Sequence, residues 1–165
     1  MFIRLAALAD GTNTVHETSA PEEIGLDAEI FHSPVELTGE VHRSENGFDF
    51  RLHVATEGDF VCDRCAVGFR RTVESDIRLL AVRRTGHAPR EREAEGLVTI
   101  GMHDAEINLD QEILDALILG LPMKILCRED CRGLCPRCGA DLNEGPCGCE
   151  NTTLGYGGDE TPEKL

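Results

Sequence analysis

Cysteine spacing constrains this chain more than any other feature of its sequence. Six of the eight cysteines lie between Cys127 and Cys149, and the other two form a CDRC pair at Cys62 and Cys65. Large apolar side chains are scarce, because 165 residues include no Trp, one Tyr and six Phe. Metal bound by the thiolates would supply stability that a thin core cannot. We therefore expect the cysteines to organise the fold.

The cysteines divide into two sets of four, the number that a structural zinc site requires. The tail set joins a CPRC turn to a nearby CGC. The remaining two pairs, brought together, would clasp the CDRC turn to the segment that precedes the tail set. Exchanged pairings, in which Cys127 or Cys131 completes the tail site, stay open. The predicted ligands of two structural zinc ions are Cys62, Cys65, Cys127 and Cys131, and Cys135, Cys138, Cys147 and Cys149.

Each CxxC turn predicts a zinc knuckle in which a nearby glycine, Gly68 or Gly139, relieves backbone strain. An iron–sulfur cluster also takes four cysteines, but CPRCG is more typical of zinc. A redox pair at Cys62 and Cys65 lacks the βαβ context of thioredoxin-like proteins. Catalytic zinc needs an open position, and two sets of four thiolates leave none. The histidines show no HxxxH or HExxH spacing, so we predict a protein that is not an enzyme and takes no small-molecule substrate.

Charge and hydropathy exclude several classes of protein. The net charge of −15 and pI near 4.7 argue against a broad basic surface for nucleic acid and suit a basic partner. No stretch approaches ~18 apolar residues, so no membrane span is predicted. The short apolar run from Leu5 to Ala9 is not a secretory signal. We expect a cytoplasmic, reducing location, in which cysteines bind metal instead of forming disulfides.

Apolar periodicity predicts an α+β fold: a mainly antiparallel β sheet or partly open barrel with one amphipathic core helix. Residues 35–41 and 48–54 both alternate in polarity, with Asn46-Gly47 between them. This pattern predicts a hairpin with a type I′ turn, whose central residues need positive φ. A first strand is expected over 2–8, a loop over 11–26 with a short turn after Pro21, and a short strand over 97–100. Residues 83–96 are expected to form a solvated loop.

A helix is predicted over 109–120, because its apolar residues recur at helical spacing. Asn108 is the candidate N-cap, with Gln111 three residues later, and Gly120 and Pro122 end the helix. The expected core stripe contains Ile113, Leu114, Leu117, Ile118 and Leu121. These elements predict a β-rich domain over 1–126, a cysteine-rich zinc-binding segment over 127–150 and a disordered tail over 151–165.

The order of hairpin, CDRC knuckle, helix and cysteine-rich tail resembles the YceD family, the large ribosomal RNA subunit accumulation proteins of bacteria and plastids. The resemblance spans roughly Val35 to Glu150, and its most specific pieces are Cys62-Asp63-Arg64-Cys65 and the segment from Gly133 to Gly145. It implies a non-enzymatic ribosome-assembly factor that supports maturation or accumulation of large-subunit ribosomal RNA. The cysteines and the helix map onto the family motif, and no catalytic residue accompanies them.

Two kinds of partner are compatible with this resemblance. Large-subunit ribosomal RNA precursor would need a cationic strip, and the acidic composition equally suits a chaperone or adaptor for a basic ribosomal protein. A zinc-stapled adaptor without a ribosomal role and a thiol redox sensor are the remaining alternatives. The arginines that could form an RNA-facing strip, or pair with nearby acids, are Arg64, Arg70, Arg71, Arg78, Arg83, Arg84, Arg90 and Arg92.

Overall fold

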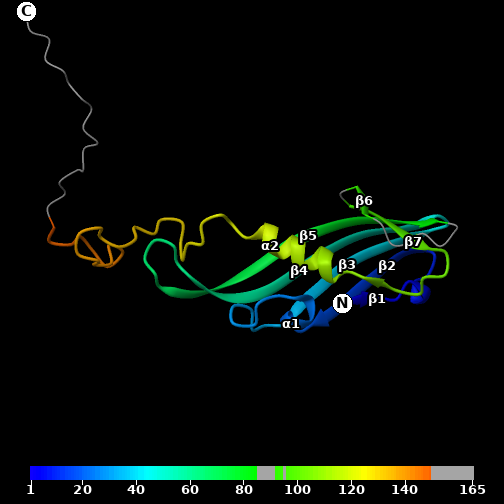
Figure 1. Ribbon diagram of the computed structural model, residues 1–165, viewed down its shortest axis with the longest axis horizontal. Coiled ribbons are helices and arrows are strands. Elements are labelled where there is room, and N and C mark those ends of the chain that lie inside the picture. Colours follow the sequence, from blue (N-terminus) through cyan, green and yellow to red (C-terminus); the bar gives the residue numbers. More distant parts are fainter. Residues whose placement is uncertain (85–91, 95, 150–165) are drawn as a thin grey trace, which may run out of the picture.

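The computed structural model describes residues 1–84, 92–94 and 96–149, and the side chains of 92–94 are not part of that description. It shows an elongated molecule in which a long β hairpin leads from the body to the cysteine-rich segment (Figure 1). The expected disorder of 151–165 and the middle of the expected loop at 83–96 lie outside the described residues. The α+β class, with more strand than helix, agrees with the prediction.

One six-stranded sheet forms the body, in the order β2-β3-β4-β5-β7-β6. Neighbouring strands run antiparallel, except that β5 and β7 are parallel. In the described part of the chain this sheet is open, with β2 and β6 at its edges, and does not close into a barrel. The strands are β2 (Gly11–Ser19), β3 (Val35–Ser44), β4 (Gly47–Val61), β5 (Gly68–Arg84), β6 (Arg92–Ala94) and β7 (Leu97–Gly101).

A second layer covers one face of this sheet. It contains α1 (Pro21–Ile24), α2 (Asp110–Gly120), and a two-stranded sheet formed by β1 (Phe2–Ile3) and β8 (Ile107–Asn108). Helix α2 lies over β4 and β5 (Figure 1). Alternate residues of β3 and β4, including Leu37 and Phe50, point toward this layer and are fully buried. Burying this apolar face is the main stabilising term for the body.

The predicted helix is present, with a different start and a narrower apolar stripe. Its N-cap is Leu109, not Asn108, whose side-chain oxygen instead accepts the Asp110 N–H at 2.7 Å. Ile113 and Leu117 are fully buried, whereas Ile118 is 49% exposed and faces away from the sheet. No helix in the described part of the chain is long and apolar enough to cross a membrane.

The first 26 residues differ from the prediction. The expected strand over 2–8 ends at Ile3 and is followed by a 3-10 helix, Leu5–Ala7. The expected loop over 11–26 contains β2, a nine-residue strand, before the short helix α1 at the predicted turn. Threonine at alternate positions of β2 gives the β propensity that apolar periodicity does not reveal. The expected loop over 83–96 likewise begins within β5 and contains β6.

The hairpin of β3 and β4 is confirmed, but the predicted type I′ turn is wrong. Ser44 pairs with Gly47, so Glu45 and Asn46 form the turn. Neither Asn46 nor Gly47 has positive φ. A Cβ on Gly47 would lie 2.0 Å from the Ala81 carbonyl oxygen of β5. Glycine is therefore required here by the close approach of a neighbouring strand and not by turn conformation.

Candidate metal centre

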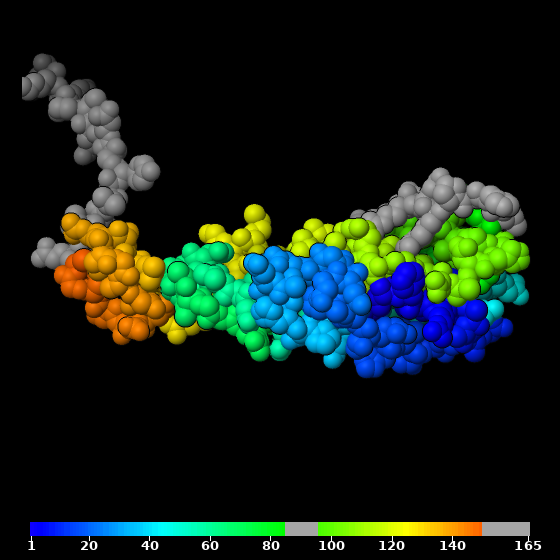
Figure 2. Space-filling view, turned by 60° about the horizontal axis from the view of Figure 1, so that its bottom comes forward, coloured from blue at the N-terminus to red at the C-terminus, as the bar shows by residue number. Residues whose placement is uncertain are grey.

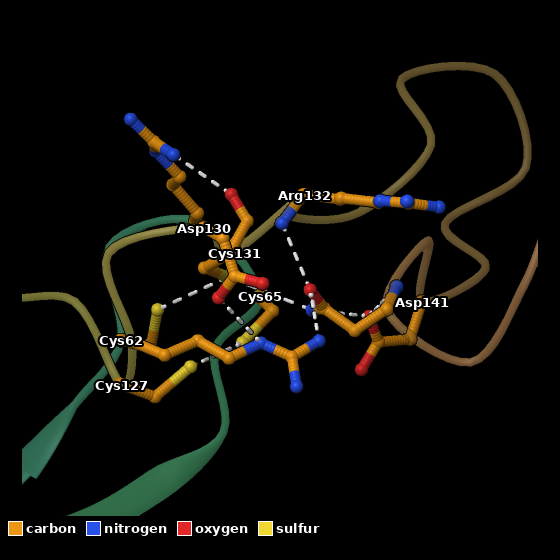
Figure 3. Close-up of polar contacts among 10 residues, drawn as sticks. Cys62, Cys65, Cys127, Asp130, Cys131, Arg132 and Asp141 are labelled. Carbon is orange, nitrogen blue, oxygen red and sulfur yellow. Dashed lines mark hydrogen bonds and ion pairs between the residues drawn. The ribbon is translucent and has the colours of Figure 1, made fainter.

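The first cysteine cluster lies at the tip of the β4–β5 hairpin, where the segment after α2 crosses it. Cys62 and Cys65 come from the hairpin, and Cys127 and Cys131 come from the crossing segment (Figure 3). The sulfur atoms of Cys62 and Cys131 are 3.8 Å apart, and those of Cys65 and Cys127 are 3.7 Å apart. A disulfide would need about 2.05 Å. All four are free thiols, and three of them are buried.

The second cluster brings together Cys135, Cys138, Cys147 and Cys149, and its ligand atoms lie within 4.8 Å of one another, as in the first cluster. Only Cys135 is buried, and Cys138 is exposed. The structure thus assembles the two sets of four that the sequence suggested, and no exchanged pairing occurs. Metal binding by these residues stays a prediction.

The two knuckles share one backbone pattern. The Cys62 N–H donates to the Val67 carbonyl and the Ala66 N–H donates to the Cys62 carbonyl, each at 2.9 Å. In the second knuckle, the Cys135 N–H donates to the carbonyl five residues later, and the Gly139 N–H donates back to Cys135, at 2.8 and 2.9 Å. The same offsets recur because each turn folds its N–H groups around a thiolate.

Backbone strain in the first knuckle falls on an unexpected residue. The residue after the second cysteine is left-handed in both knuckles, with φ of 56° at Ala66 and 73° at Gly139. The role predicted for Gly139 is confirmed. The role predicted for Gly68 is wrong, because Gly68 does not have positive φ. Alanine in this region costs about 1–2 kcal/mol, so the first knuckle keeps a strained residue where the second uses glycine.

A separate group of hydrogen bonds fastens the first knuckle to the segment after α2. The Asp63 carboxylate accepts the Ile125 N–H at 2.6 Å, and the Asp63 N–H donates to the Ile125 carbonyl at 2.8 Å. The Arg64 guanidinium donates to the Cys131 carbonyl at 2.7 Å. The two middle residues of CDRC therefore hold the crossing segment directly, a role that ligand spacing did not reveal.

Asn143 connects the two clusters. Its side-chain nitrogen approaches the Cys131 sulfur at 3.5 Å, and its side-chain oxygen accepts the Arg132 N–H at 2.8 Å. Asp141 accepts from the Asn143 backbone and side-chain nitrogens at 2.8 and 2.7 Å (Figure 3). The loop between the tail cysteines thus packs on the first cluster, and the tail site is less independent than its spacing suggests.

The surroundings of the first cluster lower the pKa of one cysteine and raise the pKa of two others. Burial opposes ionisation of Cys62, but backbone N–H groups of Cys127, Cys65 and Arg64 outweigh it and lower the pKa to about 6. Burial, together with the thiols around it, raises the pKa of Cys127 to about 12. The Val67 N–H lowers the pKa of Cys65, but burial and the neighbouring sulfurs raise it by more. One ionised sulfur can therefore begin metal binding.

The second cluster repeats this arrangement. Backbone N–H groups of Cys138 and Arg137 lower the pKa of Cys135 to about 6. The Cys138 side chain and burial raise the pKa of Cys149 to about 12. The Cys149 N–H lowers the pKa of Cys147, but the Cys135 thiol and burial raise it overall. In both sites, the first cysteine of the CxxC turn thus has a lowered pKa.

Zinc added to metal-free protein at pH 7 is expected to release at least two protons per site. Two thiols in each cluster, Cys65 with Cys127 and Cys147 with Cys149, have raised pKa values and are protonated at pH 7. Binding should weaken as pH falls, because protons compete for the same sulfurs. Calorimetry in buffers of different ionisation enthalpy counts the protons. Release of fewer than two protons per ion would contradict this arrangement.

The arginines of the predicted RNA-facing strip make several different kinds of contact within the protein. Arg64 binds within the first cluster, Arg70 pairs with Asp59 across the hairpin at 2.9 Å, and Arg83 lies 5.1 Å over the Phe48 ring. Arg70 thus supports the alternative in which the arginines pair with nearby acids, whereas Arg64 and Arg83 contact a carbonyl and an aromatic ring. The side chains of the last two members, Arg90 and Arg92, are outside the described part of the chain.

Comparison with known proteins supports the resemblance seen in the motifs. A family model described as "Large ribosomal RNA subunit accumulation protein YceD" matches residues 50–157. An uncharacterized protein of Mycobacterium tuberculosis is 32% identical over 133 residues, covering 70% of this chain and 62% of that protein. A similar protein of Mycobacterium bovis has the same identity and coverage. This chain thus spans about three fifths of the length of these relatives.

A plant protein shares a shorter region. The "Large ribosomal RNA subunit accumulation protein YCED homolog 1, chloroplastic" of Arabidopsis thaliana is 37% identical over 54 residues, covering 32% of this chain and 17% of that protein. No solved structure matches the chain. Because the family model covers well over half of the chain, including the first cluster and the tail cluster, this protein belongs to the YceD family of large ribosomal RNA subunit accumulation proteins.

Proposed function

We propose that this protein is a non-enzymatic, cytoplasmic assembly factor that supports maturation or accumulation of large-subunit ribosomal RNA. The observation that carries the proposal is the family match over residues 50–157, which contains both cysteine clusters. The name of the chloroplastic relative points in the same direction. The two clusters act in this proposal as structural clasps, which hold a binding surface without taking part in chemistry.

Zinc is the metal that best fits the clusters. A tetrahedral ion with arms of about 2.3 Å holds its sulfur ligands about 3.8 Å apart. The sulfur pairs of the first cluster are 3.8 and 3.7 Å apart, which suits a single ion. A cluster of several irons would spread the four sulfurs further. Four thiolates also leave no open position for a substrate, which supports a structural role for zinc.

Protein is a second candidate for the direct partner, in addition to RNA. Thirty-one acids against sixteen Lys and Arg favour a basic protein ligand, and internal use of Arg64, Arg70 and Arg83 reduces the cations available to phosphate. A titration of large-subunit RNA fragments across a salt series separates the two. Direct RNA binding should weaken steeply as salt rises, and a flat response would exclude phosphate contacts.

Depletion of the protein from its host is expected to reduce the large ribosomal subunit and accumulate precursor RNA. Sedimentation profiles and precursor probes measure this outcome. Wild-type protein should restore the large-subunit peak, and Cys62→Ser should not, because it removes a ligand of the first cluster. Unchanged profiles and unchanged precursor levels after depletion would rule out the assembly role and leave a zinc-stapled adaptor without a ribosomal task.

A further inference from the structure

The edge strand β2 is a regular strand that other residues could extend. It pairs with β3 without a bulge over nine positions, from Gly11 opposite Arg43 to Ser19 opposite Val35. Among the described residues, β3 is the one strand paired with it. In an antiparallel pair, alternate residues direct their N–H and C=O groups away from the neighbour. Proteins usually prevent unwanted pairing at such an edge with a proline, a lysine or a bulge, and β2 has none of them.

A groove of about 610 Å³ lies beside this edge, between β2 and the first residues of the chain. Val15 and Glu17, on the same face of β2, form one side of the groove. The buried side chains of Ile3 and Leu8 also line it, and its accessible apolar surface comes from Phe2, which is 51% exposed. An added strand would place every second side chain over this groove, because side chains alternate along a strand. Figure 2 shows these N-terminal segments, in blue, at the surface of the body.

The charge around β2 selects the kind of strand that would fit. Glu17 and Glu106 line the groove, and Arg4 is the one basic side chain among the described residues that line it. Arg43, opposite the start of β2, is engaged with Asp10 and with the Leu8 carbonyl. Further acids lie on β3, opposite β2, and on α1, directly after it: Glu36, Glu40, Glu22 and Glu23. A second copy of this chain would bring the same acids to the contact and be repelled, whereas a basic segment is attracted.

We propose that β2 accepts an extended, basic segment of a partner protein as an additional strand of the sheet. Main-chain hydrogen bonds to the open edge supply affinity, and alternate side chains supply selectivity. An apolar side chain of the segment packs on Phe2 and Val15, and a lysine or arginine meets Glu17 or Glu106. Identification of the partner as a ribosomal protein rests on the proposed function, and the strand addition itself does not.

A ten-residue peptide that repeats the order lysine, lysine, valine, valine is the probe for this site, because each face of the extended peptide then carries both kinds of side chain. Fluorescence anisotropy should show saturable binding to the full chain, and hydrogen exchange should show new protection at alternate amides of β2. Glu17→Lys should weaken binding at least about fivefold, because it replaces an attraction with a repulsion. Glu57→Lys is the matched control, since Glu57 is also exposed, lies on β4 and gives the same change in net charge. It should change the dissociation constant less than about twofold.

Several results would overturn this proposal. Absence of peptide binding, or equal weakening by Glu17→Lys and Glu57→Lys, would show that β2 is not the site. Equal binding of a peptide whose alternate amides are N-methylated would exclude strand addition. A dimer that protects β2 without peptide would make a second copy the occupant. If the peptide binds but depletion of the protein leaves the ribosome profile unchanged, the proposed function alone is refuted. If depletion reduces the large subunit but the peptide does not bind, the strand addition alone is refuted.

Discussion

Replacing Cys62 with serine is expected to lower the free energy of unfolding of the zinc-loaded protein by about 4 kcal/mol or more. Cys62 is 2% exposed and belongs to the cluster that joins the β4–β5 hairpin to the segment after α2. Its loss therefore weakens both metal binding and the link between these two segments. The clasp also closes a long loop, because Cys65 and Cys127 are 62 residues apart in sequence. Binding energy at such a site is also folding energy. Chemical denaturation followed by circular dichroism measures the change.

Cys147→Ser is the matched control for this prediction. It removes a ligand of the tail cluster, whose cysteines all follow the last described helix. We expect one zinc to be lost, with hydrogen-exchange protection falling mainly after Gly133 and the sheet melting nearly as in the wild type. Some loss of protection near Cys131 should follow, because Asn143 contacts its sulfur. If Cys62→Ser and Cys147→Ser lowered the free energy of unfolding equally, the first cluster would not be the one that stabilises the body of the protein.

Gly47→Ala is expected to lower the free energy of unfolding by about 3 kcal/mol. The added methyl would lie 2.0 Å from the Ala81 oxygen and 3.1 Å from the Val82 Cα, both backbone atoms of a neighbouring strand. Neither can move without displacing β5 from β4. The backbone of Gly47 does not have positive φ, so the expected loss is purely steric. Thermal and urea denaturation of the variant measure it.

Gly68→Ala is the control, because it is expected to raise the free energy of unfolding instead of lowering it. Gly68 begins β5, also without positive φ, and nothing lies within 4 Å of the position its Cβ would take. Alanine there restricts the unfolded chain and should raise stability by about 0.4–1 kcal/mol. If both substitutions had the same effect, the close approach of β5 to Gly47 would not be the reason for that glycine.

The sequence predicted the features that depend on short-range patterns. Alternating polarity on both sides of the turn was sufficient for the β3–β4 hairpin, because one face of each strand is buried. Helical spacing around Ile113 and Leu117 was sufficient for α2, because those two side chains face the sheet. The grouping of the cysteines followed from the need for four ligands per site and from the separation of the pairs along the chain.

Contacts between distant segments account for what the sequence did not predict. Strand β2 was missed because Val15 is the one large apolar residue among its nine, so no alternation in polarity marks the strand, although Val15 itself packs half-buried against the core. The reason for Gly47 is an oxygen more than thirty residues away, which no local turn rule includes. The contact of Asn143 with Cys131 likewise depends on how one knuckle packs against the other. In each case, the determining neighbour is visible only in the fold.

The central claim is that two ions hold this chain together through two defined sets of cysteines. Anomalous diffraction at the zinc edge, from crystals of protein purified without chelator, tests it directly. We expect two peaks, each about 2.3 Å from four sulfurs. One peak should lie among Cys62, Cys65, Cys127 and Cys131, and the other among Cys135, Cys138, Cys147 and Cys149. A single peak, or a peak whose ligands come from both sets, would contradict the account.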